Sequence, residues 1–315
     1  MTRMMLSSAL LLVLPLLGQP ASPIRVDVRL VNASFTVRDA AGKLVNGLSK
    51  TDFEIFDDGV QQSIAHFSKG EDLPLTLGLI ADVSGSQEHF VKRHHRDIAD
   101  FLKAVMKPRD EAFLVCFGNR IRLGSDLTSD RAAVLDGLDR CTKSKDRTVL
   151  TELGPKERRV LGTAFYDSMY YAITEKLSAA SGARKALVIF SDGEDNSSAT
   201  DMMTAIETAQ KFDVVQFAMR YTETDRGGVL NGRNKYGIKV MERISHETGG
   251  ADFDAGEHGM KDFFRKIEED LRSSYQIGYY PAAGSSGDDT FHKIRIRPVS
   301  PELKVRAKTG YYSRN

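Results

Sequence analysis

Tryptophan is absent from this chain, and neither sign of charge is in excess. The lack of tryptophan argues against a carbohydrate-stacking platform, although 10 tyrosines and 16 phenylalanines leave other aromatic surface. Lys and Arg together number 44 and Asp and Glu 43, so the composition gives no reason to expect a nucleic-acid partner. With 41% hydrophobic and 28% charged residues among 315, the chain has the composition of an ordinary globular protein.

Cysteine is scarce, with only Cys116 and Cys141 in the chain. Two cysteines alone do not make a zinc site. Cys116 lies in the strand-like run AFLVCF, where a buried free thiol is common, and Cys141 closes a helix-like segment. Export would permit oxidation. A disulfide between the two and a pair of buried thiols therefore both remain open.

Long apolar runs are missing except at the N-terminus. Residues 1–22 combine a positive start at Arg3, an apolar core over residues 9–17 and the ending Gly-Gln-Pro-Ala-Ser. That pattern is typical of a secretory signal peptide. The apolar core is shorter than the roughly 20 residues of a membrane span, and no nearby cysteine supports a lipid anchor. We expect an exported protein, periplasmic or extracellular, whose mature form has no membrane span; a buried N-terminal helix is the alternative.

Residues 23–73 and 273–315 have a β texture. VDVRLVNASFTVRD alternates apolar and polar residues, and DFEIFDDGVQ is a strand that enters an Asp-Gly hairpin turn. YQIGYY, FHKIRIRPV and the last residues before the C-terminus are further short strands. Neither flank is long enough to bury a core alone. We expect the two flanks to pair into one small β-sandwich; two separate ribbons packed on the central domain are the alternative.

Residues 74–272 alternate strand and helix patterns. Strands are predicted at 76–81, 111–117, 120–123 (an antiparallel edge), 185–190, 214–219 and 251–254 (an edge). Helices are predicted at 88–106, 130–138, 163–178, 200–211, 237–247 and 259–272, with long loops at 142–160 and 222–236. This alternation predicts an α/β fold with a doubly wound, mostly parallel sheet and helices on both faces.

Oxygen-bearing side chains follow the two most apolar strands. TLGLIA is followed by Asp82, Ser84 and Ser86, and KALVIF is followed by Asp192. Thr163 opens a predicted helix, where its hydroxyl is free to point outward. The carboxyl ends of parallel strands are where ligands bind in open α/β sheets. Because carboxylate and hydroxyl oxygens suit a hard cation, the pattern predicts a Mg²⁺ site at this edge.

These segments resemble a known family. DVSGS has the D-x-S-x-S signature of the von Willebrand factor A-type domain, GTAFYDSMYYA resembles that family's threonine segment, and SDGEDN its aspartate segment. The resemblance covers roughly residues 75–272 and implies a Rossmann-like fold. The flanks, through VRDAAGKLVNGLSKTDFEIFDDG, YQIGYYP and TGYY, are similar to secreted bacterial members, especially a group abundant in Acidobacteria.

The resemblance implies a metal-ion-dependent adhesion site, with its positions at Asp82, Ser84, Ser86, Thr163 and Asp192. In this family the hydroxyls coordinate Mg²⁺, with Mn²⁺ or Ca²⁺ as substitutes, and the aspartates act partly through water. A carboxylate from a partner protein completes the coordination. An ion with few charged ligands stays electrophilic toward an acidic ligand. We therefore expect a protein-binding module; a structural or assembly module with a vestigial metal site is the alternative.

A Mg²⁺-dependent hydrolase is a weaker alternative, and we expect no enzyme. Aspartyl-phosphate phosphatases carry a second acid two residues after the first, where this chain has Ser84. A serine nucleophile would need a G-x-S-x-G elbow, and DVSGS does not supply it.

Other polar residues near these segments are assigned to the surface. His89, His94 and His95 are expected on a solvated helix face, since no supporting carboxylate accompanies them. Glu194 and Asp195 are expected to be surface charge.

Overall fold

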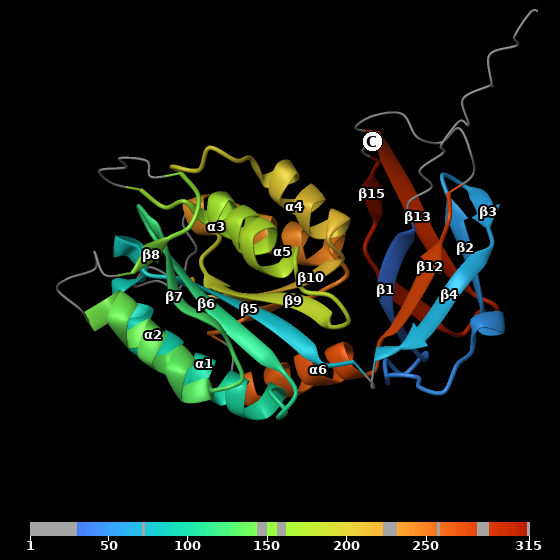
Figure 1. Cartoon of the computed structure of the whole chain (residues 1–315), viewed down its shortest axis with the longest axis horizontal. Helices are drawn as coiled ribbons and strands as arrows, with labels where there is room; N and C mark the ends of the chain where they lie inside the picture. The colour runs from blue at the N-terminus through green and yellow to red at the C-terminus, as the bar shows by residue number, and fades with distance from the viewer. Residues whose placement is uncertain are drawn as a thin grey trace, which may run out of the picture.

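A computed structural model of the protein describes residues 30–70, 73–143, 150–155, 162–222, 232–256, 259–281 and 290–313. The predicted signal segment, residues 1–22, lies outside these ranges. An α/β domain and a smaller β-sandwich lie side by side (Figure 1). No helix within the described ranges has the length and apolar character needed to cross a membrane.

A seven-stranded sheet forms the centre of the described α/β domain. Its strands are β5 (Leu75–Asp82), β6 (Glu111–Phe117), β7 (Ile121–Thr128), β8 (Thr151–Glu152), β9 (Arg184–Ser191), β10 (Val214–Arg220) and β11 (Asp252–Asp254). They are ordered β11-β10-β9-β5-β6-β7-β8. The first five in this order are mutually parallel, while β7 and β8 are antiparallel to their neighbours. The predicted α/β class with a mostly parallel sheet is confirmed.

Helices cover both faces of this sheet. Their bounds are α1 (Val91–Val105), α2 (Arg131–Lys143), α3 (Phe165–Ala172), α4 (Met202–Lys211), α5 (Gly232–Glu247) and α6 (Met260–Arg272). The buried residues of α1, α2 and α6 share one apolar cluster, and those of α3, α4 and α5 share the other. A 3₁₀ turn at Gly85–Phe90 precedes α1, and a π-helical turn at Ile173–Leu177 extends α3.

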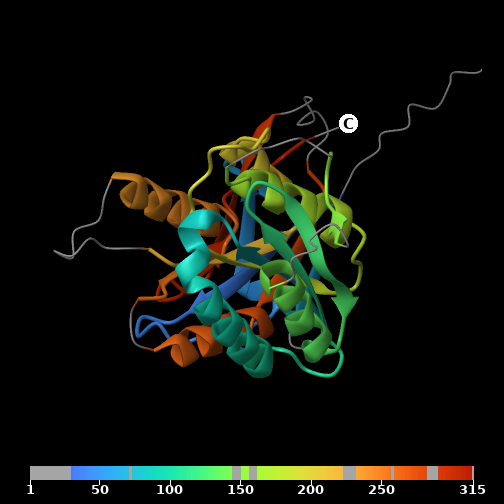
Figure 2. The ribbon, with the colours of Figure 1, turned by 90° about the vertical axis from the view of Figure 1, so that its left-hand side faces the viewer.

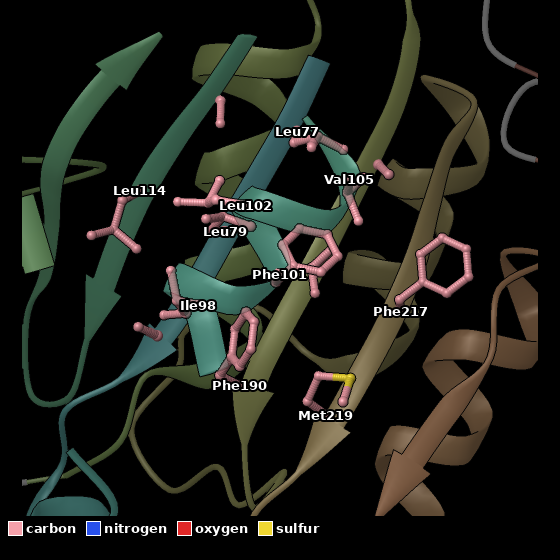
Figure 3. Packing of buried hydrophobic residues seen from close by; sticks show 14 of the residues in the cluster. Leu77, Leu79, Ile98, Phe101, Leu102, Val105, Leu114, Phe190, Phe217 and Met219 are labelled. Carbon is pink, nitrogen blue, oxygen red and sulfur yellow. The ribbon is translucent and has the colours of Figure 1, made fainter. Parts of the chain in front are cut away.

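Strand β5 is buried along its whole length because both of its faces are covered. Leu77 and Leu79 point into the cluster under α1, as Figure 3 shows, while Ile80 belongs to the opposite cluster. Gly78 faces that second cluster, and a Cβ there would lie 2.5 Å from Leu187 and 2.6 Å from Phe113. Glycine at this position therefore lets the neighbouring strands' large side chains meet across β5.

Cys116 of β6 and Cys141 of α2 are joined as a disulfide. Both are buried in the cluster that α1 and α2 share, so the bond links a sheet strand to its covering helix. Of the two states that the sequence left open, the structure contains the oxidised one.

The sandwich is built from both flanks of the chain. Its strands are β1 (Val31–Arg38), β2 (Phe53–Asp57), β3 (Val60–Gln62), β4 (Ile64–Lys69), β12 (Tyr275–Tyr279), β13 (Phe291–Pro298), β14 (Lys304–Ala307) and β15 (Gly310–Tyr312). They form two sheets, ordered β14-β1-β12-β4 and β15-β13-β2-β3. Each sheet mixes strands from both flanks, around a core where Phe35, Phe53 and Tyr275 contact one another. The predicted pairing of the flanks is confirmed.

The amino-terminal edge of the central sheet contacts the sandwich. Asp213, just before β10, accepts a hydrogen bond from Ser34 of β1 and pairs with Lys308 after β14. Asp270 of α6 pairs with Arg38 of β1 and with Arg306 of β14. The parallel strands therefore run from the sandwich toward the far end of the molecule, which is the end that faces the viewer in Figure 2.

Two segments differ from the prediction. Strand β7 was predicted as a four-residue edge, but it continues to Thr128 and β8 pairs beyond it, inside the predicted loop 142–160. Helix α5 begins at Gly232, inside the predicted loop 222–236. Strand β8 pairs through only two residues, which is too short for an alternating apolar pattern. Its extended conformation is therefore set by pairing with β7, which is distant in sequence. The rest of both predicted loops lies largely outside the described residues.

Candidate metal site at the carboxyl edge of the sheet

Strands β5 and β9 bring two of the predicted segments together. They are parallel neighbours, with Ala81 opposite Phe190, so Asp82 and Ser191 end the two strands side by side. Both residues are completely buried, and Asp192 is 4% exposed. The sequence predicted adjacency only on the condition that these two strands are neighbours, and this condition is met.

Asp82 is held by the chain around it. Its Oδ1 accepts a hydrogen bond from the Ser84 amide at 2.9 Å, and its Oδ2 accepts one from the Ser191 hydroxyl at 2.7 Å. Burial, and then the charge of nearby Asp192, raise the pKa of Asp82 to about 7. Ser191 was not among the predicted site residues. Ser191 lies beside Asp82 because of the register between β5 and β9, and this register cannot be derived from the sequence until the two strands are known to pair.

The two serines and Asp192 form a continuous row of oxygens. Ser84 Oγ lies 3.2 Å from Ser86 Oγ, and Ser86 Oγ lies 3.4 Å from Asp192 Oδ2. Asp192 also accepts hydrogen bonds from the Gln87 amide nitrogen at 2.8 Å and from the Glu194 backbone at 3.0 Å. Gln87, which the sequence did not indicate, is buried and fixes the carboxylate against the serine loop.

Gly118 lies between the threonine segment and the serine loop. The Ala164 amide donates to the Gly118 carbonyl at 2.9 Å, and a Cβ on Gly118 would lie 3.4 Å from the Ser84 Cα. At 3.4 Å such a Cβ would make an ordinary van der Waals contact, so the two segments meet at Gly118 without requiring glycine there. Thr163 is 7% exposed, and helix α3 begins two residues after it, at Phe165.

The segment after Asp192 clamps the threonine segment. The Thr163 amide donates to Asn196 Oδ1 at 2.7 Å, and the Thr163 carbonyl accepts from the Asn196 and Ser197 amides. Asp195 Oδ1 accepts from the Phe165 amide at 2.8 Å and the Tyr166 amide at 3.3 Å, which caps the first turn of α3. The expectation that Asp195 is surface charge is wrong, because its carboxylate accepts hydrogen bonds from the first amides of α3, which have no partner within the helix. Its neighbour Glu194 pairs with Arg233 at 2.5 Å.

His94 lies beneath the site and not on a solvated face as expected. Its side chain is 1% exposed, and its ring packs edge-on against Tyr221 with centroids 4.3 Å apart. Burial lowers the pKa of His94 to about 4, so the ring is neutral near pH 7. The reason is helical spacing: Ile98, one turn later on the same face of α1, is completely buried. His89 is exposed and His95 half-buried.

The donor set fits a small divalent cation. At metal–oxygen distances of about 2.0–2.1 Å, neighbouring oxygens of an octahedral Mg²⁺ shell lie about 3 Å apart. The described spacings of 3.2 and 3.4 Å along Ser84, Ser86 and Asp192 are close to this value. Among the described residues, no Lys or Arg pairs with Asp82 or Asp192, whose mutual repulsion a cation would offset. All donors are oxygens, as hard cations prefer.

Solved structures with a similar fold include three of note. A von Willebrand factor type A protein from Catenulispora acidiphila is 12% identical over 92% of this chain and 75% of its own, with a TM-score of 0.46. An aerotolerance-related membrane protein from Bacteroides fragilis is 15% identical over 62% and 98%, with a TM-score of 0.46. Proximal thread matrix protein 1 from the mussel byssus, with a zinc-occupied metal-ion-dependent adhesion site, is 14% identical over 64% and 48%, with a TM-score of 0.42.

No family model and no curated protein matches the chain. The aspartate-serine, threonine and aspartate segments occur in the order of the family that they resemble, and they meet at the carboxyl edge of a mostly parallel sheet. The α/β domain resembles the von Willebrand factor A-type domain in its fold and in the order of these segments. Membership of the secreted group abundant in Acidobacteria stays a prediction.

Proposed function

We propose that this protein is an exported binding module, in which Asp82, Ser84, Ser86, Thr163 and Asp192 hold Mg²⁺ and a partner protein supplies an exposed Asp or Glu carboxylate to the ion. Mn²⁺ or Ca²⁺ would take the same oxygens. The observation that carries the proposal is the row of serine hydroxyls beside two buried carboxylates. Among the described residues, no Lys or Arg side chain forms an ion pair with either carboxylate.

Each residue of the proposed site has a different role. Asp82 accepts hydrogen bonds from the Ser84 amide and the Ser191 hydroxyl. It therefore fixes the start of the serine loop and supplies negative charge at the buried end of the site. Ser84 and Ser86 supply neutral oxygens, and Gln87 orients the Asp192 carboxylate. The bound cation supplies positive charge that attracts a carboxylate. Ser86 is exposed while Ser84 is buried, so a partner would approach from the Ser86 side.

A structural module with a vestigial site is the second candidate, and it predicts no role for a metal in binding. We propose no catalytic role. His94, the buried imidazole nearest in sequence to the serine loop, has its ring against Tyr221 and is 1% exposed. Ser84 Oγ contacts Ser86 Oγ, which is not a base that would activate a nucleophile.

The test is capture of partners from the exported fraction of the source cells. Immobilised protein is incubated with that fraction in Mg²⁺, in EDTA, and in EDTA followed by excess Mg²⁺. We expect a partner that is released by EDTA and recovered with Mg²⁺. Thr163→Ala should lose the partner, while the matched control Thr51→Ala, an exposed threonine of the sandwich, should retain it. Capture that neither EDTA nor Thr163→Ala changes would contradict the proposal and favour the vestigial site.

Export has its own test, because the N-terminal segment is outside the described residues. We expect the protein recovered from the periplasm or medium to begin close to residue 23, as determined by mass spectrometry of its N-terminal peptide. Recovery of the intact N-terminus in the cytoplasm alone would contradict export.

A further inference from the structure

A second group of ligating side chains lies in the β-sandwich, away from the sheet edge just described. Asp57 ends strand β2, Asp58 follows it in the hairpin turn, and His292 lies in β13, the neighbouring strand of the same sheet. One ligand atom from each of the three lies within 4.8 Å of the other two. The two carboxylates therefore face one imidazole from adjacent strands.

The imidazole points at both carboxylates. His292 Nδ1 lies 2.9 Å from Asp58 Oδ2 and 3.5 Å from Asp57 Oδ1. The side chains of His292 and Asp57 are each 4% exposed. Within the described ranges Asp57 Oδ1 is buried and accepts no hydrogen bond. A buried carboxylate oxygen without a donor is costly, which indicates that something else satisfies it.

The remaining oxygens of both carboxylates are fixed by the protein. Asp57 Oδ2 accepts hydrogen bonds from the Tyr279 hydroxyl at 3.1 Å and the Tyr311 hydroxyl at 2.9 Å. Both hydroxyls are donors, since each tyrosine hydroxyl bonds the same carboxylate oxygen. These donors leave Oδ1 turned toward the imidazole, as an outer shell orients a metal ligand.

Asp58 is held in an unusual backbone conformation. Its φ is 48°, in the left-handed region, and its amide donates to the Lys293 carbonyl at 3.0 Å. In return the Lys293 amide donates to Asp58 Oδ1 at 2.8 Å, which leaves Oδ2 for His292. The Asp58 side chain is 52% exposed, so it can adjust and gives an ion a route from solvent.

We propose that Asp57, Asp58 and His292 form a second metal site, which takes a divalent transition ion such as Zn²⁺. Carboxylate oxygens and imidazole nitrogens are both known ligands of zinc. Here two carboxylates and one imidazole would supply three ligands, and a water would complete the tetrahedral coordination. Ligands of a tetrahedral zinc lie about 3.3 Å apart, and the described distances of 2.9 and 3.5 Å bracket that value. The imidazole separates this site chemically from the sheet edge, where all the donors are oxygens and Mg²⁺ is preferred.

The test uses the full-length chain with the sheet-edge site disabled by Ser84→Ala and Ser86→Ala. Zn²⁺ titrated into this protein by calorimetry should bind with a stoichiometry of one. Zinc-edge X-ray absorption should then show scattering from one imidazole. Adding Asp58→Asn should weaken Zn²⁺ binding at least about tenfold, the scale on which even outer-shell changes act. Asparagine tolerates a positive φ, so this variant retains the turn.

Two further variants make the outcome decisive. His292→Asn should abolish the imidazole signal, and a circular dichroism melt reports whether it folds; if it does not, Asp58→Asn decides alone. Glu54→Gln is the matched control, because it removes a carboxylate from the same strand that pairs with Arg297 and not with the cluster. Absence of saturable Zn²⁺ binding, or binding that Asp58→Asn leaves unchanged, would overturn the proposal and make the cluster an ion pair of His292 with two carboxylates.

Discussion

At the amino-terminal edge of the central sheet, Asp213 lies beside Lys308 at 3.5 Å and accepts a hydrogen bond from Ser34 at 2.7 Å. At the carboxyl edge of the same sheet, Asp82 lies beside a second carboxylate, Asp192. Burial acts to raise the pKa of Asp213, but Lys308 and Ser34 hold it below its usual value. At Asp82, burial and Asp192 act together and raise the pKa to about 7.

The two edges therefore differ in where their balancing charge comes from. The amino edge receives its cations from the protein, through Lys308, Arg38 and Arg306, and these contacts join the domain to the sandwich. At the carboxyl edge, hydroxyls and amides surround Asp82 and Asp192, and we propose that a cation from solution supplies the charge there. One edge is a structural contact within the protein, while the other is the proposed ligand site.

The largest expected effect is a pH dependence of the metal-free protein. The pKa of Asp82 is about 7 in the folded state and about 3.9 when unfolded. At Asp82 the folded state therefore binds more protons between these values, and the contribution of this group to stability falls as the pH rises through the window. Burial of neutral His94, whose pKa is lowered to about 4, contributes in the opposite direction over part of the same window. From Asp82 alone we expect a loss on the order of 4 kcal/mol between about pH 4 and pH 8.

Urea unfolding in EDTA at several pH values measures this loss, and Asp82→Asn isolates the contribution of Asp82. Both proteins retain His94, so the stability of the variant relative to the wild type should rise as the pH increases from about 4 to about 8. If the difference in stability between the two proteins does not change with pH, Asp82 is not responsible and the contrast between the two edges fails.

At the amino edge, Lys308→Met should destabilise the protein by about 3 kcal/mol, because it leaves Asp213 in a largely buried position without its lysine. Lys308 is 5% exposed, whereas Lys304 of the preceding strand is exposed, so Lys304→Met is the matched control. Chemical unfolding reports the stability, and Mg²⁺ titration of the folded variant should match the wild type. Unchanged stability of Lys308→Met would show that this edge does not depend on its ion pair.

The smallest expected effect compares two helix caps. Asp195 caps α3 next to Thr163, and Asp201 caps α4 through the Thr204 amide at 2.9 Å. Either aspartate changed to alanine should cost about 1 kcal/mol of stability. Only Asp195→Ala should also weaken Mg²⁺ binding, because Asp195 positions the threonine segment. Equal Mg²⁺ affinity in the two variants would show that the cap contributes to stability alone.

Much of the fold was readable from the sequence. The runs TLGLIA and KALVIF are buried on both faces, so their continuous apolar character marked them as central strands to within two residues. Pairing of the flanks followed from their short length. Strand β8 was missed because two residues carry no period, and its state depends on β7. The domain boundaries at 73–74 and 272–273 stay predictions.

The motifs of the candidate site could be predicted from the sequence, but the hydrogen bonds that connect them could not. The motifs that resemble the family signature contain Asp82, Ser84, Ser86, Thr163 and Asp192, and the structure brings their segments to one edge. His94 was missed although its spacing to Ile98 places it on the buried face of α1. Ser191, Gln87 and Asp195 act through contacts between segments distant in sequence, and no local pattern marks such contacts.

Titration calorimetry of the metal-free protein with Mg²⁺ tests whether the carboxyl edge binds an ion. We expect saturable binding of one ion by the wild type and loss of that binding in Asp82→Ala, with the variant still folded by circular dichroism. Absence of Mg²⁺ and Mn²⁺ binding by the wild type, or undiminished Mg²⁺ affinity in a folded Asp82→Ala variant, would contradict it.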